Sequence, residues 1–297
     1  MSPRTSDLAA IEALVCRDVG RGTQALIDAT RGDLAAAATA LSKATSVGLL
    51  TGFYVPRGDT PGPETDGPVG TALLAAALVA CGVPARIAVD RPCVGSVRAC
   101  VAATGQQIGV DEVADATATV AAWRAAGISH VISIERCGRS PDGKPRNMRG
   151  TDVSPWTMPF DDLFFGGPWA RLAVGDGGNE IGMGKVPYDT IARTVPNGSQ
   201  IACVTSCDHL VVAGVSNWGA YGLMAALAVV RPDWSETIGR FLTAKFDADV
   251  TRAVVDVAGA VDGVTARQEA TVDGLPPEAQ AELIDGLRRI AWGKARH

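Results

Sequence analysis

Histidine is scarce in this sequence. The 297 residues include only three, His130, His209 and His297. So few imidazoles leave little material for a histidine-based zinc site or a Ser-His-Asp triad. The seven cysteines are odd in number, form no CxxC pair and lie partly in apolar stretches, which favours buried reduced thiols over disulfides or a zinc ribbon. Any metal is therefore expected to be a hard cation held by oxygen.

The sequence also lacks a basic block and a long apolar run. A net charge of −5 and a pI of about 5.3 argue against nucleic acid and an anionic membrane surface as partners. No apolar stretch approaches the roughly 18 residues of a membrane-spanning helix, and the first residues lack the apolar core of a secretory signal. We therefore expect a cytoplasmic protein with a small-molecule ligand and no nucleic-acid or membrane partner.

What is present is an alternation of apolar strands and helices. Strands are expected over residues 46–56, 85–90, 129–135, 169–176 and 200–208, and helices over 7–19, 32–44, 69–82, 112–127 and 216–230. Ser216 or Asn217 is expected to cap the last of these. This order predicts an α/β fold with a mostly parallel sheet covered on both faces. The chain is expected to be one domain, residues 1–297, in which a core over 47–232 carries additional helices at both ends (1–46 and 233–297).

Acidic residues recur where the expected strands end. Asp90, Glu135, Asp176 and Asp208 end four of them, and Glu64 and Asp66 follow the remaining one. Ligands of open parallel sheets bind at the carboxyl ends of the strands. Carboxylates gathered there repel one another unless a cation lies between them, so the pattern predicts one or two magnesium or manganese ions.

The stretch AVGDGGNEIGMGKV, residues 173–186, is the densest glycine cluster of the chain. Asp176 is expected to reach the metal, and Gly177 and Gly178 to let the backbone approach a ligand. Asn179 and Glu180 are expected to open a short helix whose free N–H groups face an anionic substrate, with Lys185 adding positive charge. An ordinary turn after a strand is the simpler alternative.

A second segment, IERCGRSPDGKPRNMRGTDVS (residues 134–154), is rich in cations and poor in apolar residues. Arg136, Arg139 and Arg149 are suited to hold a substrate carboxylate or phosphate through bidentate contacts. The alternative is a solvated loop whose arginines pair with surface acids.

Several motifs together resemble the D-glutamate cyclase-like family. They are TGFYVP (51–56), PETDGPVGTALLAAAL (63–78), IERCGR (134–139), NMRGTDVS (147–154), GDGGNEIGMGKV (175–186) and VAGVSNWGAYGL (212–223). The resemblance runs from about Gly48 to Ala225, with Cys137 where the family usually has proline. It implies conversion of D-glutamate to 5-oxo-D-proline with loss of water, and it agrees with a metal site because the family is thought to include metal-binding members.

This reaction sets requirements that the acidic edge can meet. The attacked carboxylate needs neutralisation by a cation, the ammonium needs a base, and the substrate needs to be held folded. We expect Glu64, Asp66, Asp90, Asp176 and Glu180 to bind metal with help from Asn179. Glu135 is expected to be the base, with Asp176 and Lys185 also catalytic, and Arg136, Arg139 or Arg149 to hold the α-carboxylate.

Two other functions are compatible with the same residues. A phosphatase that depends on magnesium or manganese would act on a phosphate ester through metal-activated water, and residues 174–183 resemble the metal loop of haloacid dehalogenase-type phosphatases. A non-catalytic module that binds a metal or a small ligand is the second alternative. The chain is also compatible with a homo-oligomer.

Overall fold

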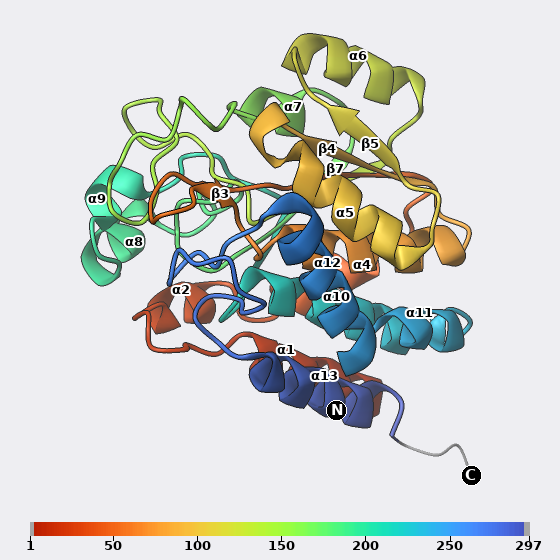
Figure 1. The fold of residues 1–297 in the computed structure, drawn as a ribbon. Helices are drawn as coiled ribbons and strands as arrows, with labels where there is room; N and C mark the ends of the chain where they lie inside the picture. Colours follow the sequence, from red (N-terminus) through yellow and green to blue (C-terminus); the bar gives the residue numbers. More distant parts are fainter. Residues whose placement is uncertain (1–2, 294–297) are drawn as a thin grey trace.

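A six-stranded parallel sheet forms the centre of the protein (Figure 1), whose computed structural model describes residues 3–293. Across the sheet the strands are β5 (Gly109–Glu112), β4 (Ala85–Val89), β1 (Val47–Leu50), β6 (His130–Ile134), β7 (Ala170–Gly175) and β8 (His209–Val212). Every neighbouring pair is parallel. The expected α/β class is confirmed, and the carboxyl ends of all six strands lie along one edge.

Helices cover both faces of this sheet (Figure 1). On one face lie α4 (Pro68–Ala80), α5 (Val94–Thr104) and α10 (Ser216–Val230), backed by α1 (Pro3–Val15), α3 (Asp33–Leu41), α11 (Ser235–Phe241), α12 (Ala244–Ala258) and α13 (Pro277–Ala291). On the other face, α6 (Ala116–Ala125) and α7 (Asp161–Phe165) pack over β4, β1 and β6. A separate cluster over β7 and β8 contains α2 (Gln24–Ala29), α8 (Tyr188–Thr194) and α9 (Gly198–Ile201). The terminal helices share the core of α4 and α10.

Strand β1 shows how the sequence assigns these faces. Val47 and Leu49 point into the core of α4 and α10, whereas Leu50 joins the opposite cluster around Trp123, as the two-residue period of a strand requires. Gly48 lies beneath that indole: a Cβ there would be 2.2 Å from Cζ3 of Trp123. The ring therefore packs directly on the backbone of the central strand.

Two strands differ from the sequence-based expectation. β5 lies where no strand was expected, because its sequence GVDE is partly exposed and has little apolar pattern. The strand expected over residues 200–208 is wrong, since α9 occupies 198–201 and β8 begins at His209. Asp208 therefore lies at the amino edge of the sheet, where its carboxylate pairs with Arg171 (2.9 Å).

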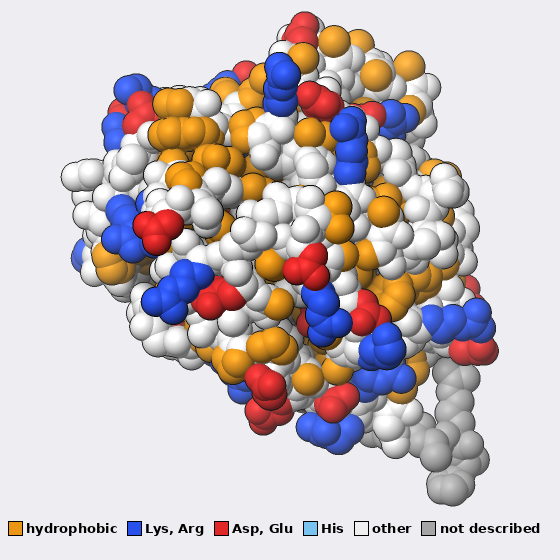
Figure 2. Space-filling view, viewed as in Figure 1, with side chains coloured by type: hydrophobic (Ala, Val, Ile, Leu, Met, Phe, Trp, Pro, Cys, Tyr) orange, Lys and Arg blue, Asp and Glu red, His pale blue; other side chains and the backbone are white. Residues whose placement is uncertain are grey.

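The described residues before β1 and after α10 are mainly helical. From residue 3 onward, three helices rather than the expected two precede β1, because α2 forms between α1 and α3. A short antiparallel pair, β2 (Tyr54–Val55) and β3 (Gly62–Pro63), lies between β1 and α4. Among residues 3–293, no helix is long and apolar enough to span a lipid bilayer. On the face seen in Figure 2, basic and acidic side chains lie interspersed among apolar ones.

Candidate acidic active site

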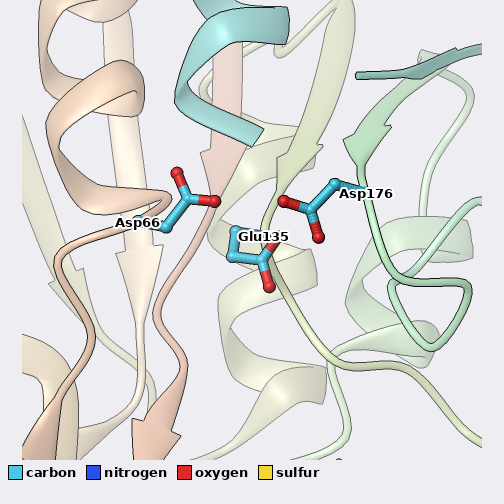
Figure 3. A group of neighbouring side chains, drawn as sticks. All are labelled: Asp66, Glu135 and Asp176. Atoms are coloured by element: carbon cyan, nitrogen blue, oxygen red, sulfur yellow. The ribbon is translucent and has the colours of Figure 1, made fainter. Parts of the chain in front are cut away.

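Three carboxylates meet at the carboxyl edge of the sheet. Asp66, Glu135 and Asp176 each place one oxygen within 4.8 Å of the other two, and their side chains turn toward one another (Figure 3). Asp66 precedes α4, Glu135 follows β6 and Asp176 follows β7. All three are buried, with 1%, 8% and 4% of their surface exposed. Such a group of oxygens is typical of a site for a hard divalent cation.

Glu135 holds its place through a strained backbone. Its φ is +47°, a left-handed conformation that is uncommon for residues other than glycine and that persists where the surrounding structure enforces it. The neighbouring Gly67 has φ +87°, and a Cβ there would lie 2.6 Å from Cβ of Glu135. The strain at Glu135 therefore serves to turn this carboxylate toward Asp66 and Asp176.

The amino end of α10 faces the same group. The backbone N–H groups of Ser216 and Asn217 donate to the Asp66 carboxylate (3.0 and 2.8 Å). Ser216 also donates its N–H to Asp176 (3.1 Å) and its hydroxyl to Glu135 (2.5 Å). Neither Ser216 nor Asn217 caps α10, contrary to the expectation, because the Asp66 carboxylate takes that role from another segment. The side chain of Asn217 instead accepts from the N–H groups of Gly67 and Gly70 (3.0 and 2.8 Å). The positive end of the α10 dipole thus lies at the buried carboxylates.

A cation that the sequence analysis did not foresee reaches the group from the turn between α1 and α2. Nη1 of Arg21 lies 2.8 Å from Asp176, and Nη2 lies 2.6 Å from Asp273 in the loop before α13. Burial disfavours the charged guanidinium, but Asp176 and Asp273 raise the pKa of Arg21 above its ordinary value. Asp18 orders this turn by accepting from the N–H groups of Arg21 (2.8 Å) and Gly22 (3.0 Å).

One arginine does not balance the buried acids. Burial raises the pKa values of Glu64, Asp66, Glu135 and Asp176. Like charges raise them further: Asp273 acts on Glu64 and Asp66, and Asp176 acts on Glu135. At Asp176, Arg21 opposes the effect of burial. The folded protein therefore binds protons on these carboxyls more tightly than the unfolded chain does.

The shift at Glu64 predicts how stability depends on pH. Its folded pKa lies above that of the unfolded chain, about 4.3, so its stabilising contribution is complete below about pH 4 and is lost as the pH rises through the folded value. Without divalent ions, the free energy of unfolding of the wild type relative to Glu64→Gln should therefore fall from pH 5 to pH 8. Urea unfolding at several pH values measures this difference, and a difference that rises with pH contradicts the environment described.

A cavity of about 420 Å³ opens over the acidic group, within the size range of small-molecule sites. Its acidic lining residues are Glu64, Glu135, Asp176 and Asp273, and its basic ones are Arg21, Arg57 and Arg149. Asn147, Met148, Asn179 and Phe53 also line it. Asp66 is not part of the lining, although one of its oxygens lies within 4.8 Å of those of Glu135 and Asp176. The cavity is therefore a mixed-charge pocket suited to a small zwitterionic or anionic ligand.

The glycine-rich loop wraps around its own glutamate. Glu180 accepts from the N–H groups of Asp176, Gly177 and Gly178 (2.7, 2.6 and 2.7 Å). No helix begins at Asn179, contrary to the expectation: the next helix is α8, from Tyr188. These N–H groups are used to hold Glu180, so they do not face a ligand.

Asp90 and Arg136 lie at the expected edge but bind each other. Nη2 of Arg136 donates to Asp90 (2.7 Å), and Nη1 donates to the carbonyl of Gly52 (2.9 Å). The N–H of Met158 also donates to Asp90 (3.0 Å), and the guanidinium lies 3.9 Å from the ring centroid of Phe160. This buried ion pair ties the segments after β1, β4 and β6 together.

The other predicted site residues lie in several places. Arg139 pairs with Asp162 (2.5 Å), and Lys185 pairs with Asp33 (2.5 Å), neither lining the cavity. Asn179 does line it and donates to the carbonyl of Arg146 (2.9 Å). Glu64, expected as a ligand, lines the cavity just outside the group of three, whereas Glu135, expected as the base, belongs to that group.

Sequence reasoning missed Arg21, Arg57, Ser216 and Asp273. Arg21 and Asp273 are in turns, far from any strand end, so hydrophobic patterning gives no signal for them. Ser216 is expected only as a helix cap. Because α10 begins shortly after β8 ends, the amino end of this helix faces the carboxyl edge of the sheet, and this position is a signal in the sequence for a site residue.

An open α/β fold with a buried acidic centre beyond its strand ends is the class of protein that these observations define. A model of the family described as "D-glutamate cyclase-like, C-terminal" matches residues 11–288. The chain belongs to the D-glutamate cyclase-like family, which confirms the resemblance and extends it toward both ends of the chain.

Human mitochondrial D-glutamate cyclase is 34% identical to this chain over 239 residues. This alignment covers 74% of the present chain and 38% of the human protein. The chain therefore spans well under half the length of that relative.

Proposed function

We propose that this protein is a divalent-metal-dependent cyclase that converts D-glutamate to 5-oxo-D-proline and water. The observation that carries the proposal is the buried group of Asp66, Glu135 and Asp176, whose oxygens lie within 4.8 Å of one another. Two of the three, Glu135 and Asp176, line a cavity that also presents arginines. Membership of the D-glutamate cyclase-like family and the similarity to a protein named D-glutamate cyclase support the substrate.

The residues present fit a hard cation. Their donor atoms are carboxylate oxygens, the ligand type that magnesium and manganese prefer. The guanidinium of Arg21 and the amino end of α10 are too little positive charge to neutralise all the buried acids of the group. Asp66, Glu135 and Asp176 would hold the ion. The chemistry that a divalent cation supplies at such a site is neutralisation and polarisation of the carboxylate under attack.

The protein's own residues account for the proton movements. The α-ammonium of the substrate loses a proton to a carboxylate, the amine attacks the γ-carboxyl carbon, and a C–N bond forms. The C–O bond then breaks, and the departing oxygen leaves as water after taking up the two protons released from nitrogen. Atoms balance as glutamate giving 5-oxoproline plus water, with no oxidant or further reactant.

Glu64 is our candidate for the carboxylate that carries the proton. It is 6% exposed and lines the cavity beside the group of three, and no described residue donates a hydrogen bond to its carboxylate. Burial and the neighbouring Asp273 and Asp66 raise its pKa, which suits proton transfer near neutral pH. Gly263 makes room for it, because a Cβ there would lie 1.5 Å from Oε1.

The decisive experiment incubates the purified protein with D-glutamate and manganese, magnesium or a chelator, and measures 5-oxoproline. Product is expected with at least one ion and none with the chelator. An aryl phosphate is tested in parallel, since its hydrolysis without cyclisation would favour the phosphatase. Absence of 5-oxoproline with every divalent ion contradicts the proposal, and binding of D-glutamate without turnover would identify a ligand-binding module.

A further inference from the structure

Arg57 follows β2, and its guanidinium is held by the loop between α12 and α13, residues 259–276. Its Nη2 donates to the carbonyl oxygens of Gly263 and Val264, the latter at 2.9 Å. Among the described residues, no carboxylate lies within ion-pair distance of Arg57, and its Nε and Nη1 have no hydrogen-bond acceptor. The guanidinium is thus held in one place in the cavity lining with donors unused.

Arg149 lines the same cavity from the 137–160 segment. Other cations of that segment are paired, as Lys144 is with Asp152 (2.8 Å) and Arg146 with Asp142 (2.5 Å). For Arg149, no described residue provides an ion-pair partner. Burial and the positive charge of Arg149 lower the pKa of Arg57 below its ordinary value, so the two guanidinium groups repel each other.

The two arginines differ in this respect from Arg21, the third basic residue of the cavity. Arg21 already forms ion pairs with Asp176 and Asp273, so its guanidinium is less available to an anionic ligand. The cavity therefore has an acidic part around Glu135 and a second part with two arginines that have no ion-pair partner among the described residues. An anionic group between two guanidiniums removes their repulsion and accepts forked hydrogen bonds.

We propose that Arg57 and Arg149 form a carboxylate-binding subsite that holds the non-reacting α-carboxylate of an amino dicarboxylate substrate. This inference rests on the proposed function and assigns the orientation of its substrate. With the α-carboxylate at the arginines, the ammonium and the γ-carboxylate lie toward Glu64 and the acidic group, where the reaction takes place. The subsite selects ligands with a carboxylate at that end.

The test compares the wild type with Arg57→Gln, Arg57→Lys and Arg149→Gln, and uses Arg252→Gln on the exposed side of α12 as the control. D-glutamate is compared with D-isoglutamine, in which the α-carboxylate is an amide. Loss of a charge-assisted contact is expected to raise KM for D-glutamate about 10- to 100-fold in Arg57→Gln, with kcat changed far less. Preference for D-glutamate over D-isoglutamine should shrink by the same factor, and Arg57→Lys should recover part of it.

Calorimetric binding of glutarate, a dicarboxylate that has no amine and cannot cyclise, separates this inference from the proposed function. Glutarate binding that weakens in Arg57→Gln but not in Arg252→Gln supports the subsite, even if the wild type forms no 5-oxoproline. An unchanged KM and unchanged glutarate affinity in Arg57→Gln and Arg149→Gln overturn it, even if cyclisation is observed. Thermal unfolding of each variant shows whether the protein stays folded without the hydrogen bonds of Arg57 to Gly263 and Val264.

Discussion

Glu135→Gln is expected to abolish metal-dependent stabilisation and to slow cyclisation by orders of magnitude. The substitution keeps the shape of the side chain but removes one of the three carboxylates, within 4.8 Å of one another, that would hold the ion. We expect manganese to raise the unfolding temperature of the wild type and to leave that of Glu135→Gln unchanged. Activity should fall by about 10²- to 10⁴-fold, measured as 5-oxoproline formed at saturating D-glutamate and manganese.

The matched control is Glu64→Gln, on the same cavity wall but outside the group of three. It should retain stabilisation by manganese and lose activity through kcat, because it removes the proposed proton carrier and no ligand. The chelated Glu135→Gln protein should also be more stable than the chelated wild type at pH 8, since a buried like charge is gone. Manganese stabilisation that survives in Glu135→Gln would place the ion elsewhere.

Arg136→Met is expected to produce the largest loss of stability. Arg136 is fully buried and its partner Asp90 is 3% exposed, so removing the guanidinium leaves an uncompensated buried carboxylate. Breaking such a pair from one side costs about 3–5 kcal/mol. Loss of the bond to Gly52 and of the stacking on Phe160 acts in the same direction. Urea unfolding of the metal-free protein measures the change.

A double-mutant cycle with Asp90→Asn tests the assigned partner. The double variant Arg136→Met, Asp90→Asn should be more stable than the sum of the two single losses predicts, because neither buried charge remains. Additive losses would show that the two groups act independently. If Asp90→Asn instead left stability unchanged and abolished manganese binding, Asp90 would be a ligand, as first expected from its place at a strand end.

The sequence predicted the fold class because burial patterns are local. Segments that are apolar all round are expected to be covered on both sides. In this sequence they are the strands before Asp90, Glu135 and Asp176 and the helices α4 and α10. The helix–strand order then requires parallel neighbours, which sends Glu135 and Asp176 to one edge. The strand error at Asp208 arose where an apolar run, residues 201–203, is buried without belonging to the sheet.

The sequence by itself determined that acidic residues gather at the carboxyl edge of a parallel sheet, because strand direction is common to all its members. Only the tertiary structure decided which cation or N–H group each acid meets. Asp90 binds Arg136, Glu180 binds its own loop, and Asp176 binds Arg21. Such pairings depend on distances between segments far apart in the chain, and a strand-end carboxylate looks the same in sequence whether it faces an arginine or an open cavity.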